Sequence, residues 1–226
     1  MELKVSEIFK SIEGEGIWVG IPTVFIRLSG CSIKCTTCDT KYAWIEGEKM
    51  PVLKVVDYVT KNFRRGRVSI TGGEPLDQIE AVTELVEWLK NYGFYPINLE
   101  TSGQIYSPEV SIFDTWSVDL KTPSSGVEAN LDAIKQFIML DPFNVQVKAV
   151  VKDRNDLRFT LTKFKYLSSL FPKFKNFVIT PFWSPGKPLN KKRVEFITSQ
   201  VSKTDIPVRV IVQQHKIMYG SSRKGV

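Results

Sequence analysis

Apolar, β-branched runs alternate along this chain with segments whose apolar residues recur at helical spacing. The strand-like runs cover residues 23–28, 67–71, 96–100, 115–120, 145–151, 177–181 and 208–212. The helix-like segments cover residues 53–63, 79–89, 127–140, 157–170 and 191–201, and Gly93 is placed to end the second of them. Uninterrupted apolar strands are typical of sheets buried on both faces. The alternation predicts an α/β fold around a mostly parallel sheet, either open or barrel-like.

Polar or glycine-rich segments follow five of these predicted strands. They cover residues 31–38, 71–75, 100–103, 119–123 and 180–183. In parallel α/β sheets, binding sites form where the carboxyl ends of the strands meet. We therefore expect these segments to build one composite site.

Composition limits the class of protein. The chain has 226 residues, the size of one domain, and has no apolar run long enough to span a membrane. Its N-terminus lacks the basic and apolar stretches of a secretory signal, so we expect a cytoplasmic protein. The net charge of +7 comes from basic clusters without the interleaved aromatic residues of an RNA-binding surface. Direct nucleic-acid binding is therefore not expected.

The cysteines carry the strongest chemical signal. The chain has only three, Cys31, Cys35 and Cys38, and all lie within eight residues. An odd number at this spacing cannot form a disulfide framework and indicates a metal site. A four-iron, four-sulfur cluster normally takes one thiolate per iron, so three cysteines would leave one iron open to a further ligand. Two alternatives remain at this point: a structural Cys₃His zinc site completed by His215, and inert buried cysteines.

A second motif, Gly72-Gly73-Glu74-Pro75, follows the run at 67–71. Two glycines let the backbone approach a ligand closely, although the same residues also suit a tight turn before a helix. With the cysteine loop one strand earlier, this motif resembles the radical S-adenosylmethionine (SAM) superfamily. The resemblance implies a partial (β/α)6 TIM-like barrel, a [4Fe-4S] cluster on the three cysteines, and SAM at the open iron. It assigns SAM binding to Thr37, Cys38, Asp39, Gly73, Glu100, Ser102, Asp119, Leu120 and Lys121.

Further segments narrow the resemblance. Residues 11–16, 20–31, 38–40, 121–126 and 214–216 are similar to the 7-carboxy-7-deazaguanine synthase family. This implies a lyase that converts 6-carboxy-5,6,7,8-tetrahydropterin to 7-carboxy-7-deazaguanine with loss of ammonia. The resemblance places the substrate on Ile12, Glu13, Gly14, Arg27 and Thr71, and a magnesium ion on Thr40.

Arg27 and Thr40 each have an ordinary alternative. Arg27 can form a bidentate pair with a substrate carboxylate, which Lys would do less well. Taken alone, it would as readily belong to a surface salt bridge. Thr40 offers the hard oxygen that magnesium prefers, but a lone threonine is more often a turn or cap residue.

The resemblance also implies partners and boundaries. It predicts a single domain at residues 1–216 followed by a basic tail at 217–226, for which disorder is one expectation. It predicts a homodimer, an electron donor such as a flavodoxin or ferredoxin, and a product that feeds the queuosine or archaeosine bases of transfer RNA. The alternatives are another radical SAM enzyme, such as a glycyl-radical activating enzyme, and a non-enzymatic zinc or RNA-binding domain.

Overall fold

A curved nine-stranded sheet forms the centre of the molecule. The computed structural model describes residues 1–225, in which the strand order is β3-β1-β2-β4-β5-β6-β7-β8-β9. Strands β2 and β4 to β9 pair in parallel, whereas β1 is antiparallel to both β2 and β3. The strands are β1 (Glu2–Ile12), β2 (Pro22–Leu28), β3 (Glu48–Pro51), β4 (Arg67–Gly72), β5 (Ile97–Thr101), β6 (Thr115–Asp119), β7 (Val145–Val151), β8 (Phe177–Pro181) and β9 (Val208–Val210).

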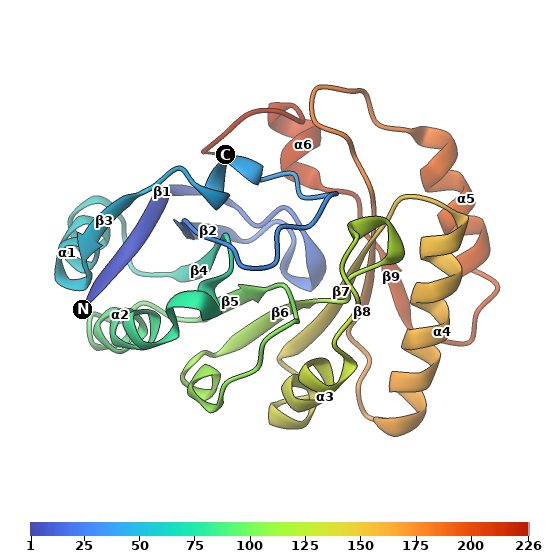
Figure 1. The fold of residues 1–226 in the computed structure, drawn as a ribbon, viewed down its shortest axis with the longest axis horizontal. Helices are drawn as coiled ribbons and strands as arrows, with labels where there is room; N and C mark the ends of the chain where they lie inside the picture. The colour runs from blue at the N-terminus through green and yellow to red at the C-terminus, as the bar shows by residue number, and fades with distance from the viewer. Residues whose placement is uncertain (226) are drawn as a thin grey trace.

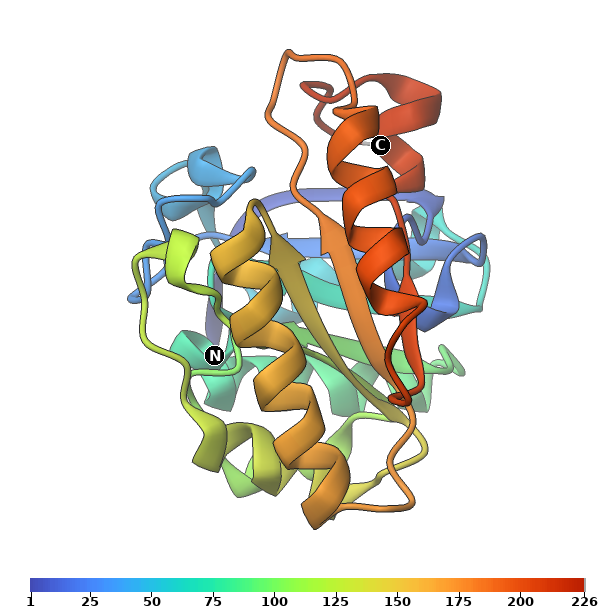
Figure 2. The ribbon, with the colours of Figure 1, turned by 90° about the vertical axis from the view of Figure 1, so that its right-hand side faces the viewer.

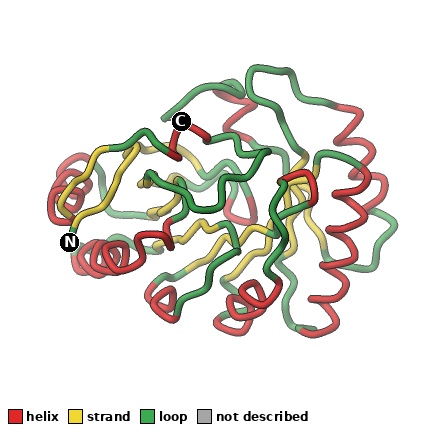
Figure 3. Tube along the Cα trace, in the orientation of Figure 1, coloured by secondary structure: helices red, strands yellow, loops and turns green. Residues whose placement is uncertain are grey.

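Helices cover the outer, convex side of this sheet, and the loops that follow the strands gather on its inner side (Figures 1 and 3). The helices are α1 (Val52–Asn62), α2 (Ile79–Asn91), α3 (Leu131–Leu140), α4 (Arg154–Leu170), α5 (Lys191–Val201) and α6 (Gln214–Tyr219), with α6 as the one on the inner side. Figure 2 shows α4 and α5 side by side against β7, β8 and β9. The end strands β3 and β9 do not pair with each other within residues 1–225, so the barrel stays open. The predicted fold class, a partial barrel with a mostly parallel sheet, is confirmed.

Burial explains why these elements form where the sequence predicts them. In β4, every residue from Arg67 to Thr71 is buried, because helices cover one face of the strand and the inner loops cover the other. Helix α2 buries Val82, Leu85, Val86 and Leu89, the stripe expected from its spacing. Each such side chain contributes about 1.5–3 kcal/mol when it is fully buried.

Two strands, β1 and β3, were not predicted. Strand β1 mixes buried residues such as Leu3 and Val5 with half-exposed polar ones, because it lies near the edge of the sheet. Strand β3 has only four residues, none of them buried, and exists because it pairs with β1. Neither has the continuous apolar run that identified the parallel strands.

Two helices begin three or four residues away from the predicted position, and side-chain caps account for both. Helix α3 begins at Leu131 rather than 127, because the Asn130 side chain accepts hydrogen bonds from the N–H groups of Asp132 and Ala133. Helix α4 begins at Arg154 rather than 157, because Asp153 caps it in the same way.

The C-terminal segment folds against the inner side of the barrel. Helix α6 extends across residue 216, the predicted end of the domain, and its Lys216 is buried. None of the helices in residues 1–225 combines the length and the apolar character that crossing a bilayer requires.

Candidate active site

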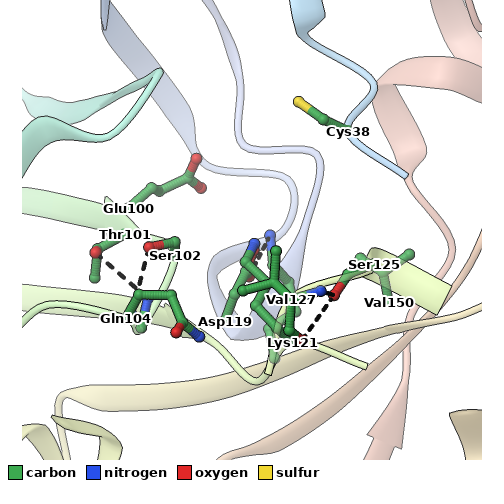
Figure 4. Close-up of polar contacts among 12 residues, drawn as sticks. Cys38, Glu100, Thr101, Ser102, Gln104, Asp119, Lys121, Ser125, Val127 and Val150 are labelled. Atoms are coloured by element: carbon green, nitrogen blue, oxygen red, sulfur yellow. Dashed lines mark hydrogen bonds and ion pairs between the residues drawn. The ribbon is translucent and has the colours of Figure 1, made fainter. Parts of the chain in front are cut away.

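A pocket opens on the inner side of the barrel, at the carboxyl ends of the parallel strands. All the residues that the sequence assigned to cluster, SAM, magnesium or substrate line it. They are Ile12, Glu13, Gly14, Arg27, Cys31, Cys35, Thr37, Cys38, Asp39, Thr40, Thr71, Gly73, Glu100, Ser102, Asp119, Leu120 and Lys121. Figure 4 shows Cys38 opposite Glu100 and Lys121 in this region. The structure thus brings the predicted residues together, as the rule for parallel strand ends requires.

The three thiols lie in the loop after β2 and are not disulfide-bonded. Cys35 is buried, and Cys31 and Cys38 are half-buried. Burial, the largest effect, raises the pKa of both Cys35 and Cys38. All three line the pocket together with Lys121, so the donor set and its surroundings fit a cluster bound by three thiolates.

The positions of the acidic, histidine and cysteine side chains bear on the zinc alternative. Within residues 1–225, no three such side chains converge on a point where one metal ion could sit. A cube of four irons does not need that convergence, because each thiolate binds a different iron. His215, which a Cys₃His site would require, instead packs against Gly14: a Cβ on Gly14 would lie 2.1 Å from the His215 Nδ1.

The cysteine loop is anchored from three directions. On one side, Ser32 donates from its N–H and its hydroxyl to Asp77, both at 2.7 Å. On a second side, the Thr36 N–H donates to the Ser125 carbonyl at 2.8 Å and its hydroxyl to the Ser124 carbonyl at 2.9 Å. The segment 121–126, noted in the sequence, therefore supports this loop as well as contributing to the pocket.

The third anchor comes from the end of the chain. Lys216 of α6 donates a 2.6 Å hydrogen bond to the Asp39 carboxylate, directly after the third cysteine. Gln213 donates to the same oxygen at 3.3 Å, and the Thr40 hydroxyl donates to the other at 2.9 Å. Although burial opposes it, the ion pair with Lys216 and these hydrogen bonds hold the pKa of Asp39 well below its usual range.

The Gly-Gly-Glu-Pro motif packs directly on the start of the cysteine loop. The Gly73 N–H donates to the Leu28 carbonyl at 3.0 Å, and the Glu74 N–H donates to the Gly30 carbonyl at 2.9 Å. A Cβ on Gly73 would lie 1.7 Å from the Gly30 oxygen, so only glycine fits here. The motif therefore needs its second glycine because its backbone packs against the backbone of the cysteine loop.

Glu74, the acidic residue of that motif, has a structural role. Its fully buried carboxylate accepts hydrogen bonds from the Thr101 hydroxyl and the Ser102 N–H, each at 2.8 Å, and from the Leu76 N–H at 3.1 Å. These bonds join the loop after β4 to the end of β5. They place Ser102 at the pocket.

The neighbouring strand ends contribute further polar groups. The Thr71 hydroxyl donates to the Glu100 carboxylate at 2.7 Å, which links the ends of β4 and β5. At the end of β6, Lys121 pairs with Asp119 at 2.8 Å. Burial alone would lower the pKa of Lys121, but Asp119 and the nearby Cys35 raise it overall. The Lys121 ammonium is therefore a permanent charge beside the thiols.

Four pocket residues that carry a carboxylate, ammonium or amide group were not assigned a role from the sequence: Glu15, Lys148, Gln213 and Lys216. Lys148 projects from β7 and pairs with Glu15, and its ammonium lies 3.7 Å from Asp119. Gln213 donates to Glu15 at 2.6 Å, which connects this pair to the Asp39 contacts. Burial opposes ionisation of Glu15, but Lys148 and His215 lower its pKa to about 2. A lysine inside the apolar run 145–151 was the one sequence signal for this network.

The loop between β1 and β2 crosses the inside of the barrel as a floor. The Glu13 N–H donates to the Ile21 carbonyl at 2.7 Å, and its carbonyl accepts from the Gly20 N–H at 2.8 Å. At the far side, the Ile17 N–H donates to Gln146 of β7 at 2.8 Å. Because the Glu13 backbone is used inside the loop, its side chain is the part left to meet a ligand.

Arg27 lies beside this floor, half-buried. Its Nε donates to Glu7 at 2.7 Å, and the same Glu7 oxygen accepts from the Tyr42 hydroxyl at 2.6 Å. The guanidinium also lies 5.8 Å from the centre of the Phe9 ring. The Arg27 salt bridge therefore exists, yet its two Nη atoms donate to no group within residues 1–225 and remain available at the pocket.

Comparison with known proteins identifies the family. The model described as "Radical SAM superfamily" matches residues 25–179. Proteins named 7-carboxy-7-deazaguanine synthase from Thermoplasma acidophilum and Koribacter versatilis are 33% and 30% identical to the chain, over 96% and 99% of it and 97% and 100% of their own lengths. The chain belongs to the 7-carboxy-7-deazaguanine synthase family of the radical SAM superfamily. The resemblance drawn from its motifs is confirmed.

Solved structures agree with this family assignment at the level of the fold. QueE from Escherichia coli superposes with a TM-score of 0.71 at 22% identity, covering 95% of each chain. A second match, anSMEcpe with bound AdoMet, has a TM-score of 0.55 at 16% identity and covers 80% of this chain and 61% of its own. This second likeness is one of fold alone.

Proposed function

We propose that this protein is a radical SAM lyase that converts 6-carboxy-5,6,7,8-tetrahydropterin to 7-carboxy-7-deazaguanine with loss of ammonia. The observation that carries the proposal is the shared pocket: three cysteines, Gly73 and an available Arg27 guanidinium all line it. Full-length similarity to two synthases of that name supports the substrate class. A glycyl-radical activating enzyme is not favoured, since these relatives match over their whole lengths.

The cofactors would be held by groups already in place. Cys31, Cys35 and Cys38 would bind a [4Fe-4S] cluster, and the segments 37–39, 100–102 and 119–121 with Gly73 would hold SAM. When bound, this pair supplies a carbon radical by reductive cleavage of SAM, and that chemistry belongs to the cofactors. The protein contributes positions. Gly73 lets the Gly-Gly-Glu-Pro backbone pack directly on the cysteine loop, and Lys121 provides a fixed cation next to that loop.

The substrate would lie between Arg27 and the floor loop. The free Nη atoms of Arg27 suit a bidentate pair with the pterin carboxylate, while Glu7 and Phe9 hold the guanidinium in position. Ile12, Glu13 and Gly14 would face one edge of the ring, and the Thr71 hydroxyl lies at the adjacent strand end. Trp44, Phe182 and Trp183 also line the pocket and would reduce the access of water to the reacting centre.

Magnesium would bind at Thr40. Its hydroxyl lies 2.9 Å from an Asp39 carboxylate oxygen, so hard oxygen donors are adjacent on the substrate side of the cysteine loop. A magnesium ion there would orient the substrate carboxylate relative to the ring. Lys216 and Gln213 would keep Asp39 ionised and fixed for this purpose.

The surroundings of the reaction follow from the same proposal. A small one-electron donor such as a flavodoxin or ferredoxin would reduce the cluster, and the protein would act in the cytoplasm as a homodimer. The product would serve the deazaguanine bases of transfer RNA, queuosine or archaeosine, without direct contact between this protein and nucleic acid.

The test is turnover under anaerobic conditions. Reconstituted protein is incubated with SAM, a reductant, magnesium and 6-carboxy-5,6,7,8-tetrahydropterin, and the product is identified by mass. We expect 7-carboxy-7-deazaguanine from the carboxylated pterin and none from the pterin without its 6-carboxylate. SAM cleavage with no deazaguanine would instead leave a radical enzyme with another substrate.

A further inference from the structure

Glu13, in the floor loop, has an unusual environment. Its side chain lines the pocket but is only 4% exposed. One carboxyl oxygen, Oε1, accepts a long hydrogen bond of 3.3 Å from the Glu15 N–H. The other, Oε2, is buried and has no hydrogen-bond partner within residues 1–225. A buried polar atom without a partner is uncommon in a native protein, and here it belongs to a side chain of a pocket-lining residue.

Within residues 1–225, no lysine or arginine forms a salt bridge with this carboxyl group. Lys148 acts on Glu13 electrostatically, but it pairs with Glu15 and lies 3.7 Å from Asp119. Arg67, at the start of β4, stacks on the Trp18 ring at 4.7 Å and forms no salt bridge with Glu13. Glu13 therefore lies in the pocket floor near two carboxylates, Glu15 and Glu100, and has no ion pair in the described part of the chain.

These surroundings disfavour a negative charge on Glu13. Burial, followed by repulsion from Glu100 and Glu15, raises its pKa to about 8, although Arg67 and Lys148 act in the opposite direction. At neutral pH the group is then an uncharged acid with one O–H donor and one carbonyl acceptor. Oε1 accepts a hydrogen bond from the Glu15 N–H, so we assign it as the carbonyl oxygen of the acid. The proton then belongs to Oε2, which has no partner within residues 1–225.

We propose that Glu13 binds the ligand as a neutral carboxylic acid, with its Oε2–H donating to an acceptor atom on the edge of the substrate heterocycle. The identity of that heterocycle rests on the proposed function. A neutral acid selects a ring carbonyl or an unprotonated ring nitrogen, whereas a carboxylate would select an N–H group. It also avoids placing another negative charge beside a substrate that brings its own carboxylate to Arg27.

The first test concerns protonation alone and needs no ligand. The free energy of unfolding is measured from pH 5 to pH 9 for the wild type, for Glu13→Gln and for Glu87→Gln, which makes the same change at an exposed site on α2. A raised native pKa means that the folded wild type binds more protons than the unfolded chain, so it loses stability as pH rises toward 8.

Glu13→Gln should therefore gain stability over the wild type from pH 5 to pH 8, and the gain should level off above that. Glu87→Gln should show no such trend. A constant difference between Glu13→Gln and the wild type would overturn the proposal. Failure of Glu13→Gln to fold at pH 7 would also overturn it, because glutamine reproduces the shape and neutrality of the protonated acid.

The second test concerns the ligand. The dissociation constant of 6-carboxypterin is measured by fluorescence with anaerobically reconstituted wild type and Glu13→Gln at pH 7 and pH 9. The ratio of the two constants cancels any ionisation of the pterin itself. Since the competent neutral form becomes rarer above its pKa, the wild type should weaken about tenfold relative to Glu13→Gln between these pH values.

An unchanged ratio would show that Glu13 does not donate to this ligand. The absence of 6-carboxypterin binding at both pH values would remove the ligand half of the proposal together with the proposed substrate. The unfolding measurements would still decide the protonation of Glu13, so the two failures can be distinguished.

Discussion

Lys216 donates a 2.6 Å hydrogen bond to Asp39 although 177 residues separate them in the chain. The first lies in the last helix and the second directly follows the last cysteine. The contact brings the C-terminus to the inner side of the open barrel. The cysteine loop is therefore held by the end of the chain as well as by its neighbours, Asp77 and the segment 121–126.

Removing this clamp should loosen the cysteine loop. In Lys216→Met, Asp39 loses its ion pair, and about a third of the Asp39 side chain is exposed to water. We expect the free energy of unfolding to fall by about 1–2 kcal/mol, which lies between the values for exposed and for fully buried ion pairs. Urea unfolding measures it. Lys61→Met, which removes a well-exposed pair with Asp57 on α1, is the control and should cost less than about 1 kcal/mol. Equal losses in the two variants would mean that the clamp is unimportant.

A methyl group at Gly73 should disrupt the packing of Gly-Gly-Glu-Pro on the cysteine loop. The Cβ would lie 1.7 Å from the Gly30 oxygen, which is backbone and cannot rotate away. The clash must shift the backbone of the motif or of the cysteine loop. We therefore expect Gly73→Ala to weaken SAM binding at least about tenfold, which corresponds to a loss of about 1.4 kcal/mol in binding free energy. Equilibrium binding of SAM to the reconstituted protein measures the effect.

Gly186→Ala is the matched control for that substitution. Gly186 has a φ of +69° but open space around its Cβ position, so it tests backbone strain without a clash. It should lose about 1–2 kcal/mol of stability and retain SAM affinity. If Gly73→Ala binds SAM as Gly186→Ala does, the close packing of Gly73 has no role in the cofactor site.

Lysine should not be able to replace Arg27 in binding the substrate carboxylate. Lysine would keep the charge but lose the paired Nη donors, so we expect Arg27→Lys to raise the KM for the carboxylated pterin about tenfold or more, from the loss of about 1.5–3 kcal/mol for a charge-assisted contact. The comparison needs steady-state kinetics together with the iron content of each preparation. A KM within twofold of the wild type would show that the substrate carboxylate binds elsewhere.

The pair between Lys148 and Glu15 should appear in the pH dependence of stability. The pKa of Glu15 is lowered from 4.5 to about 2, so this pair stabilises the protein fully above pH 4.5 and is lost as pH falls toward 2. Lys148→Met should therefore cost about 3–5 kcal/mol at pH 7, the usual cost of breaking a buried pair, and progressively less below pH 4.5.

Unfolding at pH 3, 5 and 7 tests this expectation. Lys61→Met, which removes an exposed pair with Asp57, should cost less than about 1 kcal/mol at each pH. A cost for Lys148→Met that does not fall below pH 4.5 would show that the lysine stabilises the barrel without Glu15.

The parallel strands and their helices were predictable because their residues are buried on both faces or along one stripe, and burial is visible in sequence. Strand β1 was not, since its partly exposed residues give no continuous apolar run. The site residues also divide into those that the sequence could predict and those that it could not. Cys31, Cys35, Cys38 and Gly73 follow strand ends within short motifs, whereas Gln213 and Lys216 reach Asp39 only through the folding of the C-terminus across the barrel. Contacts between segments so far apart leave no local pattern.

The central claim is that the loop from Cys31 to Cys38 holds a four-iron cluster open at one iron. Its most direct test is the iron and sulfide content of protein reconstituted without oxygen, measured beside Cys35→Ala. We predict about four irons and four sulfides per wild-type chain and a loss of the intact cluster in the variant. Zinc in place of iron, or a cluster unaffected by Cys35→Ala, would contradict the claim.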